Sequence, residues 1–123
     1  MPPLTKESGV SGITLDAGGL IAGDRNDRRV LALVARATER GLRITIPASA
    51  LAQAIRNPAR QVRLSRLIRQ AGTDLMALDG MDATADIVDA HVVVCAQRAG
   101  QAVVTSDAND LRRLAPQLLF VEV

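Results

Sequence analysis

The chain has 123 residues, of which 48% are hydrophobic, so it suits one domain with a real core and argues against disorder. No apolar run approaches the roughly 20 residues of a membrane span. The polar start MPPLTKESGVSG lacks the apolar core of a secretion signal. The single cysteine, Cys95, excludes an internal disulfide and fits a reducing cytosol. We therefore expect one cytoplasmic domain over residues 1–123 with no membrane partner, and a flexible tail at residues 1–10.

The net charge of +2 hides an asymmetry between the two parts of the chain. Residues 1–70 hold 12 Lys or Arg and 5 Asp or Glu, whereas residues 71–123 hold 3 and 8. A basic half beside an acidic half could bind nucleic acid with one part and a cation with the other. Ordinary surface charge is the alternative explanation. The lone aromatic residue, Phe120, weakens any interpretation built on stacked bases.

Short apolar runs bounded by Gly, Pro or charge predict five strands. They lie at 12–15 (GITL), 43–47 (RITIP), 74–78 (DLMAL), 101–105 (QAVVT) and 117–123 (QLLFVEV). Helical patterns occupy residues 27–40, 48–56, 59–71 and 84–99. Asp27 is the candidate N-cap of the first helix and Gly41 its stop, and Gly100 ends the last helix. The alternation predicts an α/β fold, a parallel sheet of four or five strands with helices on both faces.

Two carboxylates stand just after predicted strands: Asp16 after the first and Asp107 after the fourth. Parallel sheets bind ligands beyond the carboxyl ends of their strands, so these two acids should emerge at the same edge. For each acid alone, a strand end or a turn is an equally good explanation. Thr105 and Ser106 either orient these carboxylates by hydrogen bonding or form a turn.

A second pair of acids, Asp86 and Asp89, shares one face of the apolar helix predicted at 84–99. Buried like charges are costly unless a cation compensates them, and Mg²⁺ prefers oxygen ligands. Asp107 and Asp110 repeat the three-residue spacing. Asp86 and Asp110 could instead cap helices. His91 should point away from the acids and is a poor candidate for a general base.

These acids lie in four segments: ITLDAGGLIAGD (13–24), ITIPASALAQAIR (44–56), DIVDAHVVVCAQRAG (86–100) and VVTSDANDLRRL (103–114). In series the segments resemble the PIN-domain family, in particular the VapC-type toxin ribonucleases of bacterial toxin–antitoxin pairs.

The resemblance implies a three-layer PIN-like (Rossmann-like) domain and a metal-dependent endoribonuclease. It implies that Asp16, Asp89 and Asp107 hold Mg²⁺ or Mn²⁺ to cut an RNA phosphodiester, with Asp86 and Asp110 as accessory acids. A homodimer and a cognate antitoxin protein are implied as partners.

Two departures from the family pattern favour an alternative. Gln53 stands where the family usually has Glu, and a neutral amide should weaken cation binding. The segment between DLMAL and DIVDA is shortened to DGMDATA at residues 79–85. Both departures favour a degenerate, weakly active or inactive scaffold that binds RNA or an antitoxin without cleavage. A Rossmann-like nucleotide binder is a third possibility, but no GxGxxG follows the first strand.

Arginines recur at three- and four-residue steps between residues 56 and 69. Arg56, Arg60 and Arg63, followed by Arg66 or Arg69, form this stripe, and its first three members are candidates to hold RNA phosphates. A solvated face of an amphipathic helix is the alternative. Gly18 and Gly19 lack the rest of a phosphate-binding loop, and we expect them to let the backbone turn tightly into a helix.

Overall fold

The computed structural model describes residues 11–56, 60–70, 72–76 and 85–123, and the side chains of residues 85–90 lie outside its described part. The elements are β1 (Gly12–Leu15), α1 (Ala17–Asp24), α2 (Arg28–Glu39), β2 (Arg43–Pro47), α3 (Ala48–Ala54), α4 (Val62–Arg69), β3 (Thr73–Met76), α5 (Ala85–Ala99), β4 (Ala102–Thr105), α6 (Asn109–Leu114) and β5 (Phe120–Glu122).

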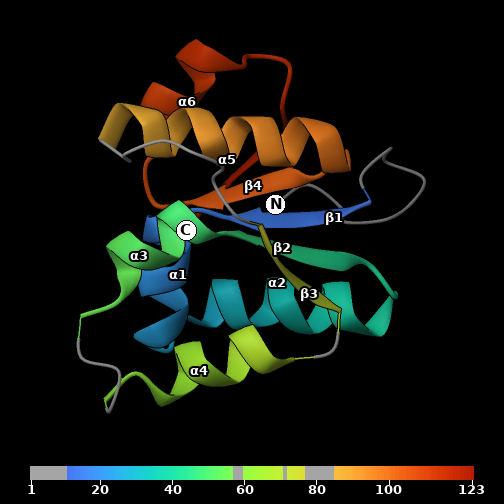
Figure 1. Ribbon diagram of the computed structural model, residues 1–123. Helices are drawn as coiled ribbons and strands as arrows, with labels where there is room; N and C mark the ends of the chain where they lie inside the picture. Colours follow the sequence, from blue (N-terminus) through green and yellow to red (C-terminus); the bar gives the residue numbers. More distant parts are fainter. Residues whose placement is uncertain (1–10, 57–59, 71, 77–84) are drawn as a thin grey trace.

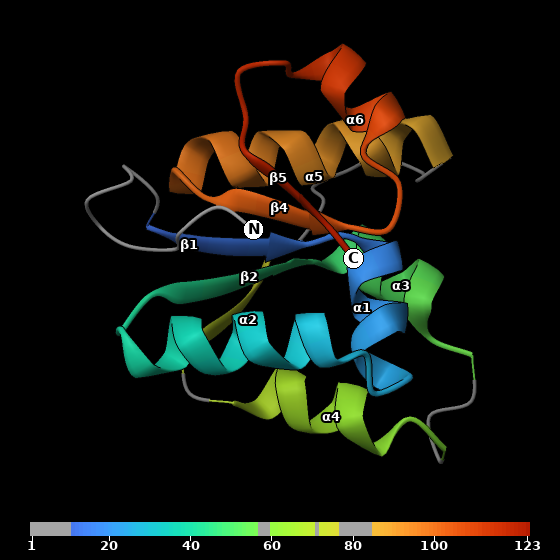
Figure 2. The same cartoon turned by 180° about the vertical axis from the view of Figure 1, so that it is seen from behind.

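The strands form one parallel sheet in the order β3-β2-β1-β4-β5. Helices α5 and α6 cover one face of the sheet, and α1, α2 and α4 cover the other (Figures 1 and 2). The predicted α/β fold is therefore confirmed, with five strands and helices on both faces. The arrangement is consistent with a three-layer PIN-like or Rossmann-like fold.

The central strand β1 and its neighbour β4 are buried along their whole length. Ile13, Leu15, Val103 and Val104 have no exposed surface. Strands covered on both faces need apolar side chains at successive positions, which is why these runs do not alternate with polar residues. The core continues into the helix layers, where Leu33 of α2 is also fully buried.

Helix α2 has the predicted caps. The side chain of Asp27 accepts a hydrogen bond from the backbone N–H of Arg29 at 2.9 Å, which satisfies one of the open donors of the first turn. Gly41 has a φ of +66°, a left-handed conformation that ends helices and that glycine adopts without strain. Local sequence signals therefore set both ends of this helix.

The two largest differences from the predicted boundaries lie at the starts of elements. The helix predicted at 59–71 begins only at Val62, and the strand predicted at 117–123 begins only at Phe120. Before that strand the chain makes a turn in which Leu118 N–H donates to the Ala115 carbonyl at 3.2 Å. Apolar residues in a turn and in a strand look alike in sequence, so QLLFVEV gave no sign of this change.

Strand β3 is described only from Thr73 to Met76. The rest of its predicted range lies outside the described residues, as does most of the shortened segment at 79–85. Within the part of the chain that the structure describes, no helix is long and apolar enough to cross a membrane.

Candidate metal site at the edge of the sheet

The direction in which the chain adds strands reverses between β1 and β4. From β1 the chain continues to β2 and β3 on one side, and it later returns to β4 and β5 on the other. Open parallel sheets bind their ligands beyond the carboxyl ends of the strands at such a switch point. In Figure 1 these carboxyl ends lie on the left. We call the segments that follow β1 and β4 there, residues 16–19 and 105–109, the switch-point edge.

The structure places Asp16 and Asp107 on the two sides of this switch point. Asp16 directly follows β1, and Asp107 stands two residues beyond the end of β4. Leu15 is the register partner of Val104, and the N–H of Asp16 donates to the Val104 carbonyl at 3.3 Å. Neighbouring strands are about 4.8 Å apart. The prediction that both acids emerge at one edge is therefore in keeping with the topology.

Asp16 has a structural role as well. Its Oδ1 accepts a hydrogen bond from the backbone N–H of Gly19 at 2.8 Å, so it is the N-cap of α1. This bond fixes the orientation of the half-buried carboxylate at the edge. The helix itself, with three glycines in eight residues, has weak intrinsic propensity. A helix was expected after Gly18 and Gly19, but no hydrophobic pattern predicted its extent.

Gly18 and Gly19 allow α1 to begin directly against β4. A Cβ on Gly18 would lie 2.1 Å from Ser106 Oγ, and a Cβ on Gly19 would lie 2.5 Å from the Val104 carbonyl oxygen. Neither glycine has a positive φ. Close approach, rather than unusual backbone conformation, is thus what these positions require.

The turn that carries Asp107 is held by several hydrogen bonds. Thr105 Oγ1 accepts from the N–H of Asp107 and donates to its carbonyl, both at 3.1 Å. Asp107 Oδ1 accepts from the N–H of Asn109, also at 3.1 Å. Thr105 is buried while Asp107 is exposed. Thr105 therefore forms the turn and fixes the backbone of Asp107, and it does not bond to the carboxylate.

Helix α5 approaches the same edge through its first half. His91 Nδ1 lies 2.7 Å from Oγ of Ser49, which stands in the first turn of α3 directly after β2. Both side chains are buried. Asp86 and Asp89 belong to the two turns of α5 before His91, but their side chains lie outside the described part. Whether Asp89 meets Asp16 and Asp107 stays a prediction.

His91 is engaged with Ser49 and has 9% of its surface exposed. This Ser–His pair joins α3 to α5, and the burial of both side chains limits their access to a substrate. This agrees with the expectation that His91 is a poor general base.

The remaining candidate ligands are exposed. Gln53 lies in the last turn of α3, and Asp110 lies in the first turn of α6. Asp110 does not cap α6, because the cap position is Ala108, and its carboxylate is 4.0 Å from the guanidinium of Arg113. Among the described side chains, no group of three His, Cys, Asp or Glu gathers in a way that would hold a metal ion. That statement does not include Asp86 and Asp89.

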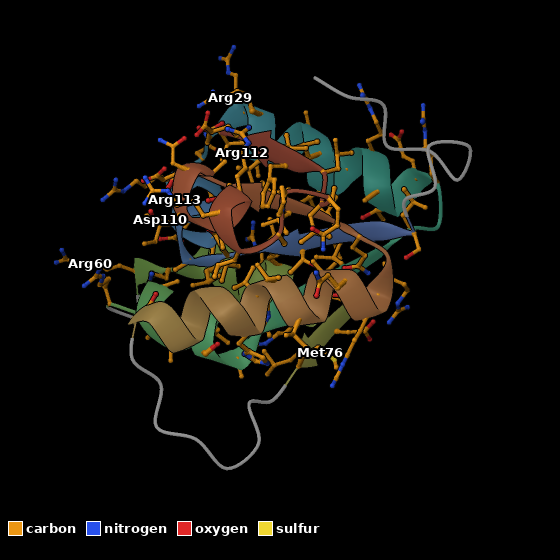
Figure 3. All side chains as sticks on the ribbon, turned by 90° about the horizontal axis from the view of Figure 1, so that it is seen from above. Arg29, Arg60, Met76, Asp110, Arg112 and Arg113 are labelled. Atoms are coloured by element: carbon orange, nitrogen blue, oxygen red, sulfur yellow. The ribbon has the colours of Figure 1, made fainter. Side chains whose placement is uncertain are left out.

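The arginine stripe is not one continuous helix face. Helix α3 ends at Ala54 and α4 begins at Val62, so Arg56 and Arg60 precede the helix that carries Arg63. The amide of Gln61 links the two helices by accepting from Arg56 N–H at 2.9 Å and donating to the Ala54 carbonyl at 3.0 Å. Figure 3 shows Arg60 on the same side of the molecule as Asp110 and Arg113.

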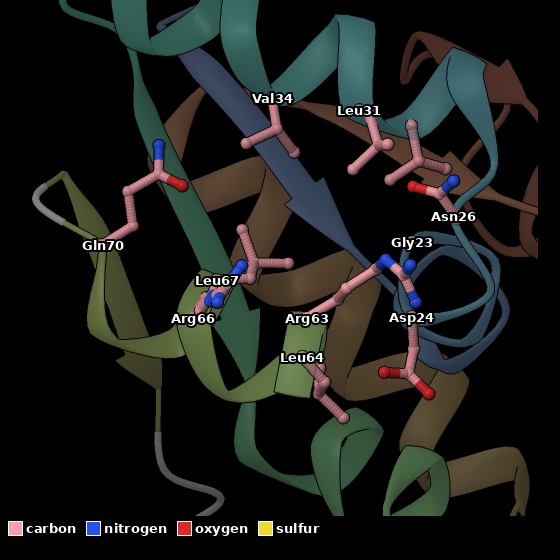
Figure 4. Close-up of a pocket in the computed structure, with 11 residues that line it drawn as sticks. Gly23, Asp24, Asn26, Leu31, Val34, Arg63, Leu64, Arg66, Leu67 and Gln70 are labelled. Carbon is pink, nitrogen blue, oxygen red and sulfur yellow. The ribbon is translucent and has the colours of Figure 1, made fainter. Parts of the chain in front are cut away.

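Arg63 and Arg66 line a pocket of about 290 Å³ between the end of α1, α2 and α4. Aliphatic and polar side chains both line it, and Figure 4 shows Arg63 reaching toward the end of α1, where Asp24 and Asn26 lie. This pocket is separate from the switch-point edge. Arg63 is therefore a weaker candidate for the rim of the acidic edge than Arg60.

Several described groups outside the edge have shifted pKa values. The hydrogen-bonded guanidinium of Arg43 lowers the pKa of Asp74, and this pair joins β2 to β3. A similar hydrogen bond from Arg29 lowers the pKa of Asp27. Burial raises the pKa of the Cys95 thiol, so it is not an activated nucleophile.

Sequence reasoning missed one acid at this edge. Glu122 ends β5, the strand beside β4, and its Oε1 accepts a hydrogen bond from the N–H of Ala108 at 3.1 Å. The rule that selected Asp16 and Asp107, an acid at the carboxyl end of a parallel strand, applies equally to Glu122. Glu122 lies within the range of the predicted strand QLLFVEV rather than after it, so it was not recognised as an acid at a strand end.

Fold and edge together define an α/β protein of the Rossmann-like class with acidic residues at its switch point. No model of a known protein family matches the sequence, and no curated protein matches it significantly. The resemblance to PIN domains therefore remains an inference from the motifs.

Proposed function

We propose that the protein is a metal-dependent endoribonuclease, the toxin component of a cytoplasmic toxin–antitoxin pair. The observation that carries the proposal is the placement of Asp16 and Asp107 beyond the carboxyl ends of adjacent strands at the switch point. The order of the four acidic segments along the chain supports it. RNA, a cognate antitoxin and a second copy of the chain are the proposed partners.

The residues at this edge fit a hard divalent cation, Mg²⁺ or Mn²⁺. Carboxylate oxygens are the ligands such cations prefer. Asp107 is exposed, and its Oδ2 makes no hydrogen bond within the described part of the chain, so that oxygen is available to a ligand. Asp89 is the third proposed ligand. Asp86, Asp110 and Gln53 are assigned supporting roles, either as additional ligands or through bound waters.

The chain's own residues would hold and orient the reacting groups. The helix cap fixes Asp16, and the Thr105 turn fixes Asp107. Arg56 and Arg60, with Arg63 as the weakest candidate, would hold RNA phosphates. A bound cation would supply Lewis acidity, because it neutralises charge on a phosphate oxygen and makes a nearby water more acidic.

The test compares Asp16→Asn with wild type in cleavage of a defined RNA pool, with and without Mg²⁺. Asparagine caps helices about as well as aspartate, so the variant should keep its thermal stability. Loss of an outer-shell partner of a metal costs up to about 100-fold. Because Asp16 is proposed as a direct ligand, we expect cleavage to fall at least about 100-fold.

Glu39→Gln is the matched control, because this exposed residue at the end of α2 also loses one negative charge. It should cleave like wild type. Mg²⁺-independent cleavage, or equal activity in Asp16→Asn, would contradict the proposal.

A second function, RNA or antitoxin binding without cleavage, is favoured by Gln53. This exposed amide stands where the resembling family has a charged ligand. We expect Gln53→Glu to tighten Mg²⁺ binding in titration calorimetry and to raise cleavage, because it adds a charge to the site. If wild type binds RNA without cutting it and Gln53→Glu restores cutting, the second function is correct. Equal or weaker Mg²⁺ binding in the variant would place Gln53 outside the site.

A further inference from the structure

The carboxylate of Glu122 acts on the Asp107 turn from a neighbouring strand. Its Oε1 accepts the 3.1 Å hydrogen bond from Ala108 N–H, although the two residues are 14 positions apart in sequence. Glu122 is the register partner of Thr105, and the N–H of Val123 donates to the Thr105 carbonyl at 2.8 Å. Strand β5 therefore stays paired with β4 up to the start of the turn.

The turn needs this acceptor. Ala108 precedes α6 and has no side-chain oxygen, so it cannot cap the helix itself. Ala108 is fully buried, and a buried backbone N–H without a hydrogen-bond partner is costly. The next N–H, that of Asn109, is bound by Asp107 Oδ1. Two carboxylates thus share the open donors at this point, one local and one from β5.

We propose that Glu122 is a positioning residue for Asp107. By holding Ala108, it fixes the segment between Asp107 and Asn109, which keeps Asp107 Oδ1 on the Asn109 N–H and leaves Oδ2 for a divalent cation. Outer partners that orient metal ligands commonly affect metal affinity strongly. The inference rests on the proposed function, because it assigns Asp107 a cation to hold.

The experiment measures Mg²⁺ affinity by titration calorimetry on the full chain, for Glu122→Ala and Glu122→Gln. The glutamine keeps a carbonyl oxygen that can accept from Ala108 but loses the charge. Positioning predicts that Glu122→Ala raises the Kd about tenfold while Glu122→Gln stays within about twofold of wild type. Glu39→Ala, which removes an exposed glutamate at the end of α2, is the matched control and should bind Mg²⁺ like wild type.

Amide hydrogen exchange at Ala108 provides a readout that does not depend on metal. Exchange should accelerate in Glu122→Ala and stay slow in Glu122→Gln. Unchanged exchange in Glu122→Ala would show that the bond does not hold the turn. If Glu122→Gln weakens Mg²⁺ binding as much as Glu122→Ala, the charge matters and positioning is wrong.

Asp107→Asn separates this inference from the proposed function. If Asp107→Asn loses Mg²⁺ binding while Glu122→Ala keeps it, the metal site stands and the positioning role is overturned. If Asp107→Asn and Asp16→Asn both bind Mg²⁺ like wild type, the proposed site itself is wrong, and the role of Glu122 falls with it.

Discussion

At the residue scale, Gly19 shows how the absence of a side chain fixes the position of α1. In an exposed helix, replacing glycine by alanine stabilises by up to about 1 kcal/mol. At Gly19 the added Cβ would lie 2.5 Å from the Val104 carbonyl oxygen, a backbone atom that cannot rotate away. We expect Gly19→Ala to lower the free energy of unfolding by about 1–3 kcal/mol, measured by urea denaturation.

Gly23→Ala in the same helix is the control for that prediction. There the Cβ would meet only a side-chain methyl of Val30, at 3.1 Å, which can shift by a small amount. Its effect should be clearly smaller than that of Gly19→Ala. Equal stability of the two variants would mean that β4 can move away from α1, and that the edge is less tightly built than described.

At the scale of elements, the contact between α3 and α5 helps to position the first half of α5. The buried pair Ser49–His91 joins the start of α3 to α5 at 2.7 Å. Ser49→Ala would leave a buried imidazole nitrogen without its partner, so we expect a loss of about 1–3 kcal/mol in the free energy of unfolding.

A double-mutant cycle with His91→Leu isolates this interaction. Replacing both partners removes the unsatisfied group, so the double variant should be more stable than the sum of the single effects predicts. Additive losses would mean that the two side chains do not interact. If the pair also holds α5 in place for Asp89, Ser49→Ala should weaken Mg²⁺ binding as well.

At the scale of the whole molecule, the basic first part of the chain has to offset the acidic edge if RNA is to approach it. Arg60 is exposed and lies on the same side of the molecule as Asp110 (Figure 3). We expect RNA affinity to fall steeply with salt, and each lost phosphate contact to flatten the log–log slope by about 0.7 for single strands. The measurement is a salt series on an Arg60→Ala, Arg63→Ala double variant in an Asp16→Asn background.

Arg98→Ala is the control, because this exposed arginine stands in the last turn of α5, at the opposite end of that helix from its acids. It should leave the slope unchanged. Since Arg63 turns toward the pocket beside α1, we expect Arg60 to account for most of the change. An unchanged slope in the double variant would assign these arginines to solvent or to a protein partner.

The candidate site could be predicted only in part from sequence. Asp16 and Asp107 were found because an acid directly after a buried strand is a local signal, and parallel topology turns it into a shared edge. The same local rule applies to Glu122, but its hydrogen bond to Ala108, 14 residues away, depends on β5 pairing with β4 and could not be predicted. The Ser49–His91 pair was missed for the same reason, since its two residues are 42 positions apart.

The sequence by itself determined the α/β class, the positions of β1 and β2, and the caps of α2. These depend on apolar runs, hydrophobic periodicity and single residues such as Asp27 and Gly41, all of which act over a few neighbouring positions. Only the tertiary structure decided three other features: the strand order β3-β2-β1-β4-β5, the start of α1 against β4, and the hydrogen bond by which Glu122 fixes the Asp107 turn. Each of these requires residues distant in the chain to meet, and packing rather than local preference brings them together.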